Sequence, residues 1–385
     1  MNLRARRVGR HVALCWGMRT APARMLSFMA ALAVLLSATP SSAFKLPVSE
    51  ESYLNVAILL QPQLQLVDEG APSGGPGTDM FLRRTRLLVF GNITRRLSFF
   101  AETDQPHFGK NGDWSVAFFI QDAFISYEVA EKIWIDVGML LPPLTRHVLQ
   151  GAIALQAVDY HSNLVRWTPG VGKVWRDIGV QVRGFAGPLG FRAAIFNGVN
   201  GKTTPEGTVL NPDDLPRVTA MARWNFFTRE EDLFFQGIYF ASEPRLSVGL
   251  GADYQPKAVA TESGLHDAVG TAADVFLDVP LANDQEFVFN ATLFHYRQGL
   301  DNPRSGTGFY AETGWRFGKL QPLISGECFK ARVAGQDQLA LKPGFNIWFQ
   351  KHTLNLRTEV AVAWTGDLSQ ARAAVTGTSQ LQLFY

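Results

Sequence analysis

The chain has 385 residues, of which 46% are hydrophobic, and it carries 36 basic and 34 acidic side chains. Six arginines and no acid lie in residues 1–43, so the rest of the chain has 30 basic and 34 acidic residues, a net charge of −4. This acidic balance gives no support to nucleic-acid binding, and Cys328 is the only cysteine after residue 43, which excludes a disulfide within one chain.

Residues 1–43 are typical of a secretory signal peptide. The arginine-rich start is followed by the apolar run MLSFMAALAVLLSA, which is too short to span a bilayer as a helix. Small residues, Ser41 and Ala43, then occupy the −3 and −1 positions of a cleavage site before Phe44. Met18 is an alternative start that gives a signal of ordinary length. The competing interpretation is a single membrane anchor.

The chain after residue 43 consists of many segments in which apolar and polar side chains alternate. In residues 53–66, for example, Gln61, Gln63 and Gln65 lie on the face opposite Leu60 and Leu64, which is the period of a β-strand. Sixteen such strands are predicted, at 53–66, 79–93, 96–104, 114–129, 132–140, 174–185, 189–199, 216–227, 245–255, 266–279, 286–298, 306–317, 319–333, 338–350, 352–364 and 378–385.

The connections between these strands alternate between short and long. Short ones lie at 95–96, 130–132, 186–190, 317–319 and 349–352; long polar ones rich in Gly and Pro lie at 67–78, 105–113, 141–173, 200–215, 256–265 and 299–305. This pattern predicts an all-β fold, a 16-stranded antiparallel transmembrane β-barrel of residues 44–385 with short periplasmic turns and long extracellular loops.

One further segment, residues 232–242, also has strand character. We interpret it as a longer turn, because an even number of strands closes the barrel with both termini on the periplasmic side. A soluble sandwich or propeller would explain the strands. It would not explain the sided loop lengths, the signal peptide and the aromatic C-terminus together.

The C-terminal residues TSQLQLFY predict the strand that closes the barrel. Leu381, Leu383 and Tyr385 share one face of this strand, and Gln380 and Gln382 share the other. A barrel in lipid cannot leave an unpaired edge, so this strand is expected to pair with the first. The terminal aromatic and the alternate apolar residues resemble the signal that the barrel-assembly machinery recognises.

A series of short motifs runs through residues 80–200 in a defined order. These are Arg83, Arg84 and Arg86; the acidic end of strand 96–104; Asp122–Ala123; Val137–Gly138 with Pro142 and Pro143; and the strands at 176–184 and 193–201. In order and spacing they resemble the phosphate-selective porin O/P family of outer-membrane barrels. The resemblance implies a trimer of 16-stranded barrels in which a third loop, here 141–173, folds inward and narrows the pore.

The resemblance also implies that arginines in the lumen guide anions. Alternation places Arg84 and Arg86 on one face of their strand and Arg83 on the other. We favour Arg84 and Arg86 inward, because a charge on the lipid face at mid-depth costs roughly 2–4 kcal/mol. The alternative is that these arginines lie at the membrane edge, against headgroups or structural carboxylates.

The third loop contains the candidate residues of a constriction. Arg146 and Arg166 could set its charge, and the neighbouring strands add Arg176 and Arg183 as pore-lining candidates. Further candidates within the loop are His147, Asp159, His161 and Lys173. The alternative is that the loop arginines form salt bridges with Asp159 or with carboxylates of the barrel wall.

These features predict an outer-membrane porin, surrounded by lipid, for the passive diffusion of small anionic or polar solutes such as phosphate. At this size side chains cannot fill the lumen, so a water-filled channel is expected. The acidic net charge and the absence of a lysine-rich loop cluster favour weak selectivity over strict phosphate specificity. The alternative function is a non-conducting structural or adhesion barrel.

An enzymatic function finds little support in the sequence. The stretch DYHSN (159–163) suggests a Ser-His-Asn hydrolase, but adjacent residues His161 and Ser162 would point apart on a strand, and a nucleophile needs its base within hydrogen-bond reach. Histidine and cysteine are too few for a metal site with ligand spacing. We therefore expect no cofactor, no metal and no catalytic activity.

Overall fold

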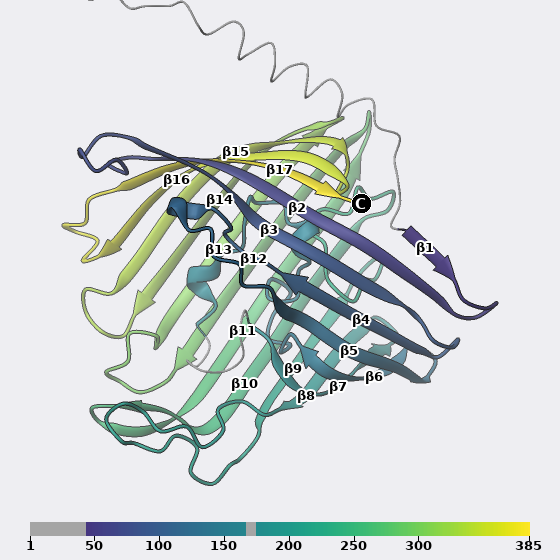
Figure 1. Ribbon diagram of the computed structural model, residues 1–385, viewed down its shortest axis with the longest axis horizontal. Helices are drawn as coiled ribbons and strands as arrows, with labels where there is room; N and C mark the ends of the chain where they lie inside the picture. Colours follow the sequence, from purple (N-terminus) through teal and green to yellow (C-terminus); the bar gives the residue numbers. More distant parts are fainter. Residues whose placement is uncertain (1–43, 167–174) are drawn as a thin grey trace, which may run out of the picture. The chain divides into compact units, whose positions relative to one another are not determined.

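The computed structural model describes residues 44–166 and 175–385, so the predicted signal peptide (1–43) and Lys173 lie outside the described residues. Within these ranges the chain forms a short strand, β1 (Phe44–Pro47), three 3-10 helices, and sixteen strands of a closed barrel (Figure 1). The helices are η1 (Lys110–Gly112), η2 (Ala152–Ala154) and η3 (Ser162–Leu164). The barrel strands are β2 (Tyr53–Val67), β3 (Gly77–Asn92), β4 (Leu97–Asp104), β5 (Phe119–Ala130), β6 (Ile133–Leu140), β7 (Asp177–Ala186), β8 (Leu189–Phe196), β9 (Arg217–Asn225), β10 (Arg245–Thr261), β11 (Gly264–Leu281), β12 (Gln285–Arg297), β13 (Gly306–Phe317), β14 (Leu320–Ala331), β15 (Asp337–Gln350), β16 (Leu354–Gly366) and β17 (Ala374–Phe384).

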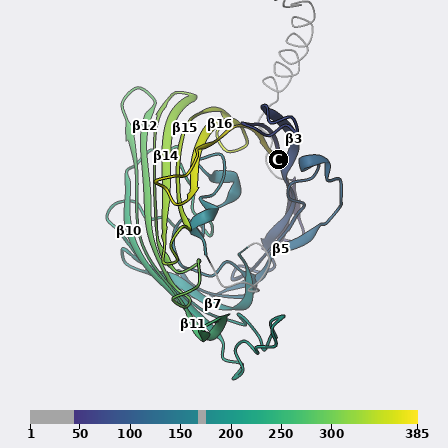
Figure 2. The same ribbon diagram turned by 90° about the vertical axis from the view of Figure 1, so that its left-hand side faces the viewer.

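Each barrel strand pairs antiparallel with the next, and β17 pairs with β2 to close the ring (Figure 2). The closing register joins Thr376 to Val67 at one end and Phe384 to Leu59 at the other. Closure gives every strand two partners, so no row of backbone N–H and C=O groups is left as an edge. The prediction of a 16-stranded antiparallel barrel closed by the C-terminal strand is confirmed. None of the described helices is long and apolar enough to cross a membrane.

The two ends of the barrel differ in their connections. We call the end that carries the C-terminus the turn end, because six of its seven connections have two to four residues. The other end, the loop end, carries the longer connections 68–76, 105–118, 141–176 and 197–216. The alternation of short and long connections is therefore as predicted, with one exception at each end.

The exception at the loop end concerns residues 256–265, which we predicted to be a long loop. Strands β10 and β11 instead continue through this stretch as a hairpin, in which Thr261 pairs with Gly264. A β-bulge between Gln255 and Val259 absorbs the irregular sequence around Pro256 and keeps the ladder intact. The expected loop was therefore wrong, because a bulge lets a strand pass a proline that would otherwise end it.

The exception at the turn end is the long connection between β9 and β10, residues 226–244, which we call the turn-end insert. Its residues 232–242 form no strand, as predicted. However, it is not an external turn: its middle section folds back into the barrel, where Phe235 and Ile238 are buried. Residues 141–166 enter the lumen from the opposite end, and we call them the loop-end insert.

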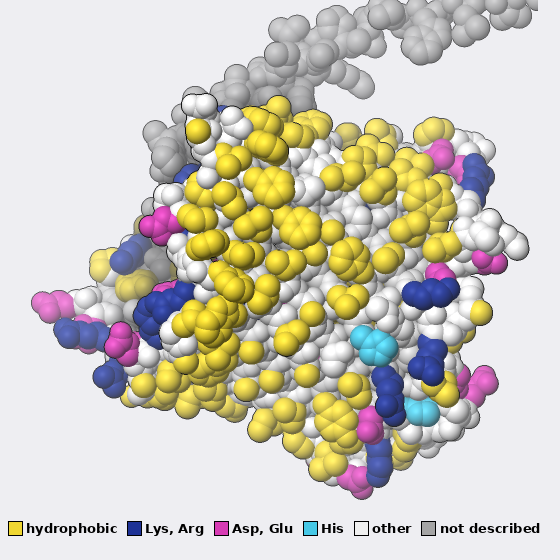
Figure 3. All heavy atoms as spheres, turned by 180° about the vertical axis from the view of Figure 1, so that it is seen from behind, with side chains coloured by type: hydrophobic (Ala, Val, Ile, Leu, Met, Phe, Trp, Pro, Cys, Tyr) yellow, Lys and Arg dark blue, Asp and Glu magenta, His cyan; other side chains and the backbone are white. Residues whose placement is uncertain are grey.

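Side chains on the barrel wall alternate between the outside and the lumen except where a β-bulge shifts the register. Along β9, Arg217, Thr219 and Arg223 are buried, whereas Val218 and Trp224 are nearly half exposed on the outside. The same alternation on neighbouring strands covers the outer wall with hydrophobic side chains, while charged side chains gather toward the two ends (Figure 3). A water-soluble barrel has a polar outside and an apolar interior. The opposite arrangement here is the one expected of a barrel surrounded by lipid.

Several strand boundaries differ from the prediction, and one short strand was not predicted. Strand β5 begins at Phe119 rather than at residue 114, so Trp114 and Phe118 belong to an exposed loop. The short strand β1 was not predicted; its Phe44 pairs with Val56 of β2. Strands β1 and β17 pair with the same edge of β2. Strand β1 therefore continues the pairing of β2 past the point where β17 ends at the C-terminus.

Candidate functional site

The candidate functional site is the barrel lumen, and its wall is lined by arginines on β3. Alternation alone would have pointed Arg83 outward, but a β-bulge in the pairing of β2 with β3 changes the register at this point. Arg83 and Arg84 consequently both bind one carboxylate, Asp159 of the loop-end insert, at 2.5 and 2.6 Å. Arg86 points inward as well and is buried. The bulge therefore brings three arginines, not two, to the lumen.

Arginines on adjoining strands pair with carboxylates in the lumen. Arg86 binds Glu102 at 2.8 Å and Asp104 at 3.0 Å, both on the neighbouring strand β4. The other pairs are Arg176–Asp122, Arg183–Asp136, Arg217–Asp253 and Arg316–Glu286. Burying a lone charge is costly, so each of these arginines is offset by an acid on a nearby strand. Two other buried wall arginines, Arg192 and Arg357, instead donate to carbonyl and amide oxygens. The result is a wall rich in charge but locally near neutral.

The loop-end insert is attached to the far side of the lumen through His161. Its Nδ1 lies 2.5 Å from Glu327 of β14, and its ring stacks on Tyr310 of β13 with 4.3 Å between centroids. Burial alone would lower the pKa of His161, but the carboxylate of Glu312, 3.7 Å from its Nε2, and that of Glu327, bonded to its Nδ1, outweigh burial and raise it. The neighbouring His147 differs, because burial and the charge of His161 lower its pKa to about 3. Carboxylates thus favour the protonated form of His161, whereas burial disfavours it for His147.

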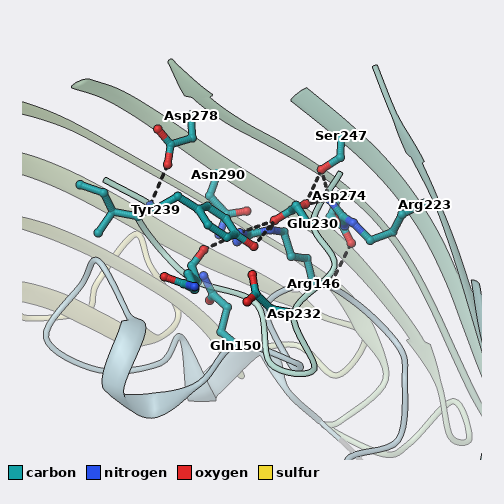
Figure 4. Close-up of polar contacts among 12 residues, drawn as sticks. Arg146, Gln150, Arg223, Glu230, Asp232, Tyr239, Ser247, Asp274, Asp278 and Asn290 are labelled. Atoms are coloured by element: carbon teal, nitrogen blue, oxygen red, sulfur yellow. Dashed lines mark hydrogen bonds and ion pairs between the residues drawn. The ribbon is translucent and has the colours of Figure 1, made fainter. Parts of the chain in front are cut away.

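The turn-end insert is held by one buried carboxylate, Glu230. Arg146 of the loop-end insert donates to it at 2.7 Å, and Arg223 of β9 donates at 3.2 Å (Figure 4). The hydroxyls of Ser247 and Tyr239 add hydrogen bonds of 2.6 and 3.1 Å. Burial would raise the pKa of Glu230, but the two arginines outweigh it and lower the pKa to about 2. Glu230 therefore joins both inserts to the wall.

The two inserts also pair with each other through their backbones in the middle of the lumen. Gln150 and Phe235 form a parallel β-bridge, and the N–H of Gly237 donates to the carbonyl of Ala154 at 2.6 Å. A Cβ atom at residue 237 would collide with the backbone of Gln156, so only glycine permits this approach. Segments that enter from opposite ends are thus joined into one internal partition.

The partition leaves a cavity of about 360 Å³ on the side of β3, β4 and β5. The opposite side of the loop-end insert has little space, because Gln156 bonds to Gln321 and Asn346, and Arg357 donates to the carbonyl of Ala157. The free space in the lumen therefore lies along the strands that carry Arg86 and Glu102.

The candidate residues named from sequence fall into four groups. Arg84, Arg86, Arg176 and Arg183 lie on the wall with carboxylate partners; Arg146, His147, Asp159 and His161 lie in the loop-end insert and make buried contacts. Arg166 donates to the carbonyls of Asn163 and Pro303 and lies over the ring of Phe329. Gln380 and Gln382 are buried in the lumen, and Leu383 and Tyr385 are exposed on the outside.

Sequence reasoning missed the turn-end insert and its residues Glu230, Asp232 and Phe234. A signal was present, because three consecutive acids, Glu230 to Asp232, precede an apolar run in the connection that we interpreted as a longer external turn. The carboxylates Glu102, Asp104 and Asp274 were missed as well. They occupy inward positions beside strands that carry arginines, so cross-strand pairing of the predicted register would have found them.

The hydrolase interpretation of residues 159–163 does not fit the geometry. The side chain of His161 is buried against Glu327, whereas Ser162 is exposed, so the two do not form a nucleophile and its base. Among the residues that the structure describes, no group of three His, Cys, Asp or Glu side chains could hold a metal ion.

The barrel is similar in fold to solved outer-membrane proteins. An anion-selective porin from Comamonas acidovorans superimposes with a TM-score of 0.60 at 10% identity, over 87% of this chain and 100% of that one. OprB of Pseudomonas putida gives 0.61 at 9% identity, over 86% and 94% of the two chains. OmpT of Vibrio cholerae in its trimer form gives 0.55 at 10%, over 87% and 100%. At such low identities the likeness shows the porin-type fold alone.

No protein-family model matches the sequence, and no curated protein matches it. The comparisons thus support a porin-type barrel and not the phosphate-selective porin O/P family in particular.

Proposed function

We propose that this chain is an outer-membrane porin of a Gram-negative bacterium, through which small solutes diffuse passively. The observation that carries the proposal is the closed barrel with an apolar outside and a charged, ion-paired lumen that two inserts narrow without filling. An apolar outer band favours lipid as the surroundings, and paired charges in the lumen favour water within it. Export through the predicted signal peptide, residues 1–43, and assembly by the barrel-assembly machinery are parts of this proposal.

A finer form of the proposal is a preference for anions such as phosphate, guided by the arginines named from sequence. Arg84, Arg86, Arg146, Arg176 and Arg183 each lie within 2.8 Å of a carboxylate. A passing phosphate must compete with these carboxylates for the same donors. Arg166 forms no ion pair with a described residue, and it lies in the loop-end insert. We therefore propose that the anion preference is weak.

We also propose that the chain assembles as a homotrimer. The loop 105–118 exposes Trp114, Val116 and Phe118, which are 59–70% accessible. Exposed apolar side chains on a loop outside the barrel wall support a contact with another protein surface. OmpT of Vibrio cholerae, which has a similar fold, is described in a trimer form. The mass of the native complex in detergent tests this assembly, with one chain per particle as the contrary result.

A second candidate function is a non-conducting structural or adhesion barrel. The observation that favours it is the internal partition, in which the two inserts are joined by backbone hydrogen bonds. The two candidates differ in one measurable property, the passage of ions.

The test is conductance of the refolded protein in a planar bilayer under a KCl gradient, with and without added phosphate. Discrete channel steps with a small reversal potential are expected. Anion-selective current that low phosphate blocks would support the finer form of the proposal. A correctly folded, heat-modifiable barrel that passes no ions would reject the porin and leave the structural barrel.

A further inference from the structure

The cavity beside the internal partition has two chemically different walls. Its volume of about 360 Å³ falls in the range of small-molecule sites. Residues of β3, β4 and β5 form one side, and the two inserts form the other, with His352 and Phe384 at the turn end. The cavity is thus bounded by rigid strands and by inserts that are themselves held in place.

One wall is aromatic. Phe90 of β3 and Phe100 of β4 line the cavity and pair with each other in register, and Phe124 of β5, which pairs with Phe100, lies next to this lining. The centroid of Phe100 lies 6.0 Å from Phe90, 5.6 Å from Phe124 and 5.3 Å from Phe234 of the turn-end insert. Phe384 of β17 lines the same cavity. These rings offer faces and edges that suit a planar, apolar group.

The other wall is charged, and all but one of its charges have a partner. Arg86 is bound by Glu102, and Arg176 is bound by Asp122 at 2.8 Å. Asp232 of the turn-end insert also lines the cavity, but its carboxylate forms no hydrogen bond or ion pair with a described residue. Its backbone carbonyl accepts a hydrogen bond from Arg192, which fixes its position. The lining therefore offers one uncompensated negative charge beside an aromatic surface.

We propose that this cavity binds a solute that carries both an aromatic ring and an ammonium group, that is, an aromatic amine. The ring packs among Phe90, Phe100 and Phe234, and the ammonium group donates to Asp232. This inference rests on the proposed porin function and names the class of solute that the cavity beside the partition retains.

The ion pairs already formed by the charged residues of the lining determine which sign of charge the solute should carry. An aromatic acid would need the guanidinium of Arg86 or Arg176, and both already bind carboxylates. An amine meets Asp232 without displacing any ion pair, and aromatic faces attract cations in addition. His352 adds no positive charge, because burial lowers its pKa to about 4, and its Nε2 is bonded to the carbonyl of Ile238.

The test is isothermal titration calorimetry of the refolded protein in detergent with 2-phenylethylamine as the probe. Binding is expected for this probe, and weaker or absent binding for 3-phenylpropionate, which has the opposite charge, and for butylamine, which has no ring. The variant Asp232→Asn is expected to weaken binding about tenfold or more, as the loss of a charge-assisted hydrogen bond predicts. Phe234→Leu keeps the apolar volume but removes a ring, and it should also weaken binding.

The matched control is Glu131→Gln, which removes an exposed carboxylate at the β5–β6 turn, outside the cavity. Binding by this variant should equal that of the wild type. Equal binding of the amine and the acid, or unchanged binding by Asp232→Asn in a folded barrel, would overturn the inference.

Channel recordings separate this inference from the proposed function. A conducting channel whose current 2-phenylethylamine does not reduce would reject the solute site and leave the porin. Calorimetric binding that depends on Asp232 in a barrel without conductance would reject the porin and retain the amine site. Reduced current in the wild type, together with little reduction in Asp232→Asn, would support both.

Discussion

The backbone N–H of Gly237 donates to the carbonyl of Ala154 at 2.6 Å, and this bond joins two segments that enter the barrel from opposite ends. A porin-type barrel narrowed only from the loop end would leave the turn end open. Here the turn-end insert meets the loop-end insert inside the lumen, so the width of the passage depends on both.

The first prediction concerns the size of the pore. Backbone hydrogen bonds continue the β9–β10 hairpin to Thr228 and Pro244, so residues 229–243 can be replaced by an Asn-Gly turn without loss of barrel pairing. Single-channel conductance should rise, because half of the partition is gone. Shortening the exposed loop 367–373 serves as the control and should leave conductance unchanged. Equal conductance of deletion and wild type would show that the insert does not narrow the pathway.

The second prediction concerns the stability of the partition. Glu230→Gln leaves Arg146 and Arg223 buried without their shared carboxylate, which should cost about 3–5 kcal/mol in the free energy of unfolding. The adjacent Glu231 binds Lys132 and Arg229 at the surface, where its side chain is 48% exposed. Glu231→Gln should therefore cost at most about 1 kcal/mol. Urea unfolding of refolded protein measures both, and equal losses would contradict the assigned role of Glu230.

A pH dependence follows from His161. Its folded pKa is raised above the ordinary 6.5 by Glu312 and Glu327, so its contribution to stability is fully present below pH 6.5 and is lost as pH rises through the folded pKa. The difference in unfolding free energy between wild type and His161→Gln should therefore shrink above pH 6.5. The exposed His295 provides the matched control, His295→Gln, for which no such trend is expected. A difference that stays constant with pH would argue against a charged His161.

Ion selectivity should respond to Asp159. This carboxylate is shared by Arg83 and Arg84, and its loss in Asp159→Asn leaves both arginines free to attract anions. An added interaction of about 1 kcal/mol, the value for two charges 4 Å apart in water, changes anion partitioning about fivefold. The reversal potential under a KCl gradient should shift toward anion selectivity. Asp213→Asn, at an exposed pair with Lys257, is the control; an unchanged potential in Asp159→Asn would place these arginines outside the ion path.

Most of the barrel could be predicted from the sequence. The sixteen strands follow from side-chain alternation, and the closing pair of β17 with β2 follows from the requirement that a barrel in lipid has no free edge. These are local or purely topological constraints, so no knowledge of distant contacts was needed. The inward position of Arg84 and Arg86 was likewise predictable from alternation and the cost of charge in lipid.

Other features depend on contacts between distant residues, which alternation does not report. The position of Arg83 required the bulge opposite Pro62, and the extended hairpin of β10 and β11 required another bulge near Val259. A bulge shifts the register by one residue and reverses the side to which a side chain points. The sequence around these two bulges shows the side-chain alternation of an ordinary strand, which does not reveal where the register shifts.

The sequence by itself determined the architecture, because the lipid-facing half of every strand must be apolar and the period of a strand is two residues. Only the tertiary structure decided what occupies the lumen. The direction taken by residues 226–244 depends on Glu230 meeting Arg146 and Arg223, which lie 84 and 7 residues away along the chain. Glu230 and Arg146 become neighbours only when the barrel closes. The acidic and aromatic stretch of residues 226–244, which from sequence resembles an external turn, therefore becomes part of the internal partition.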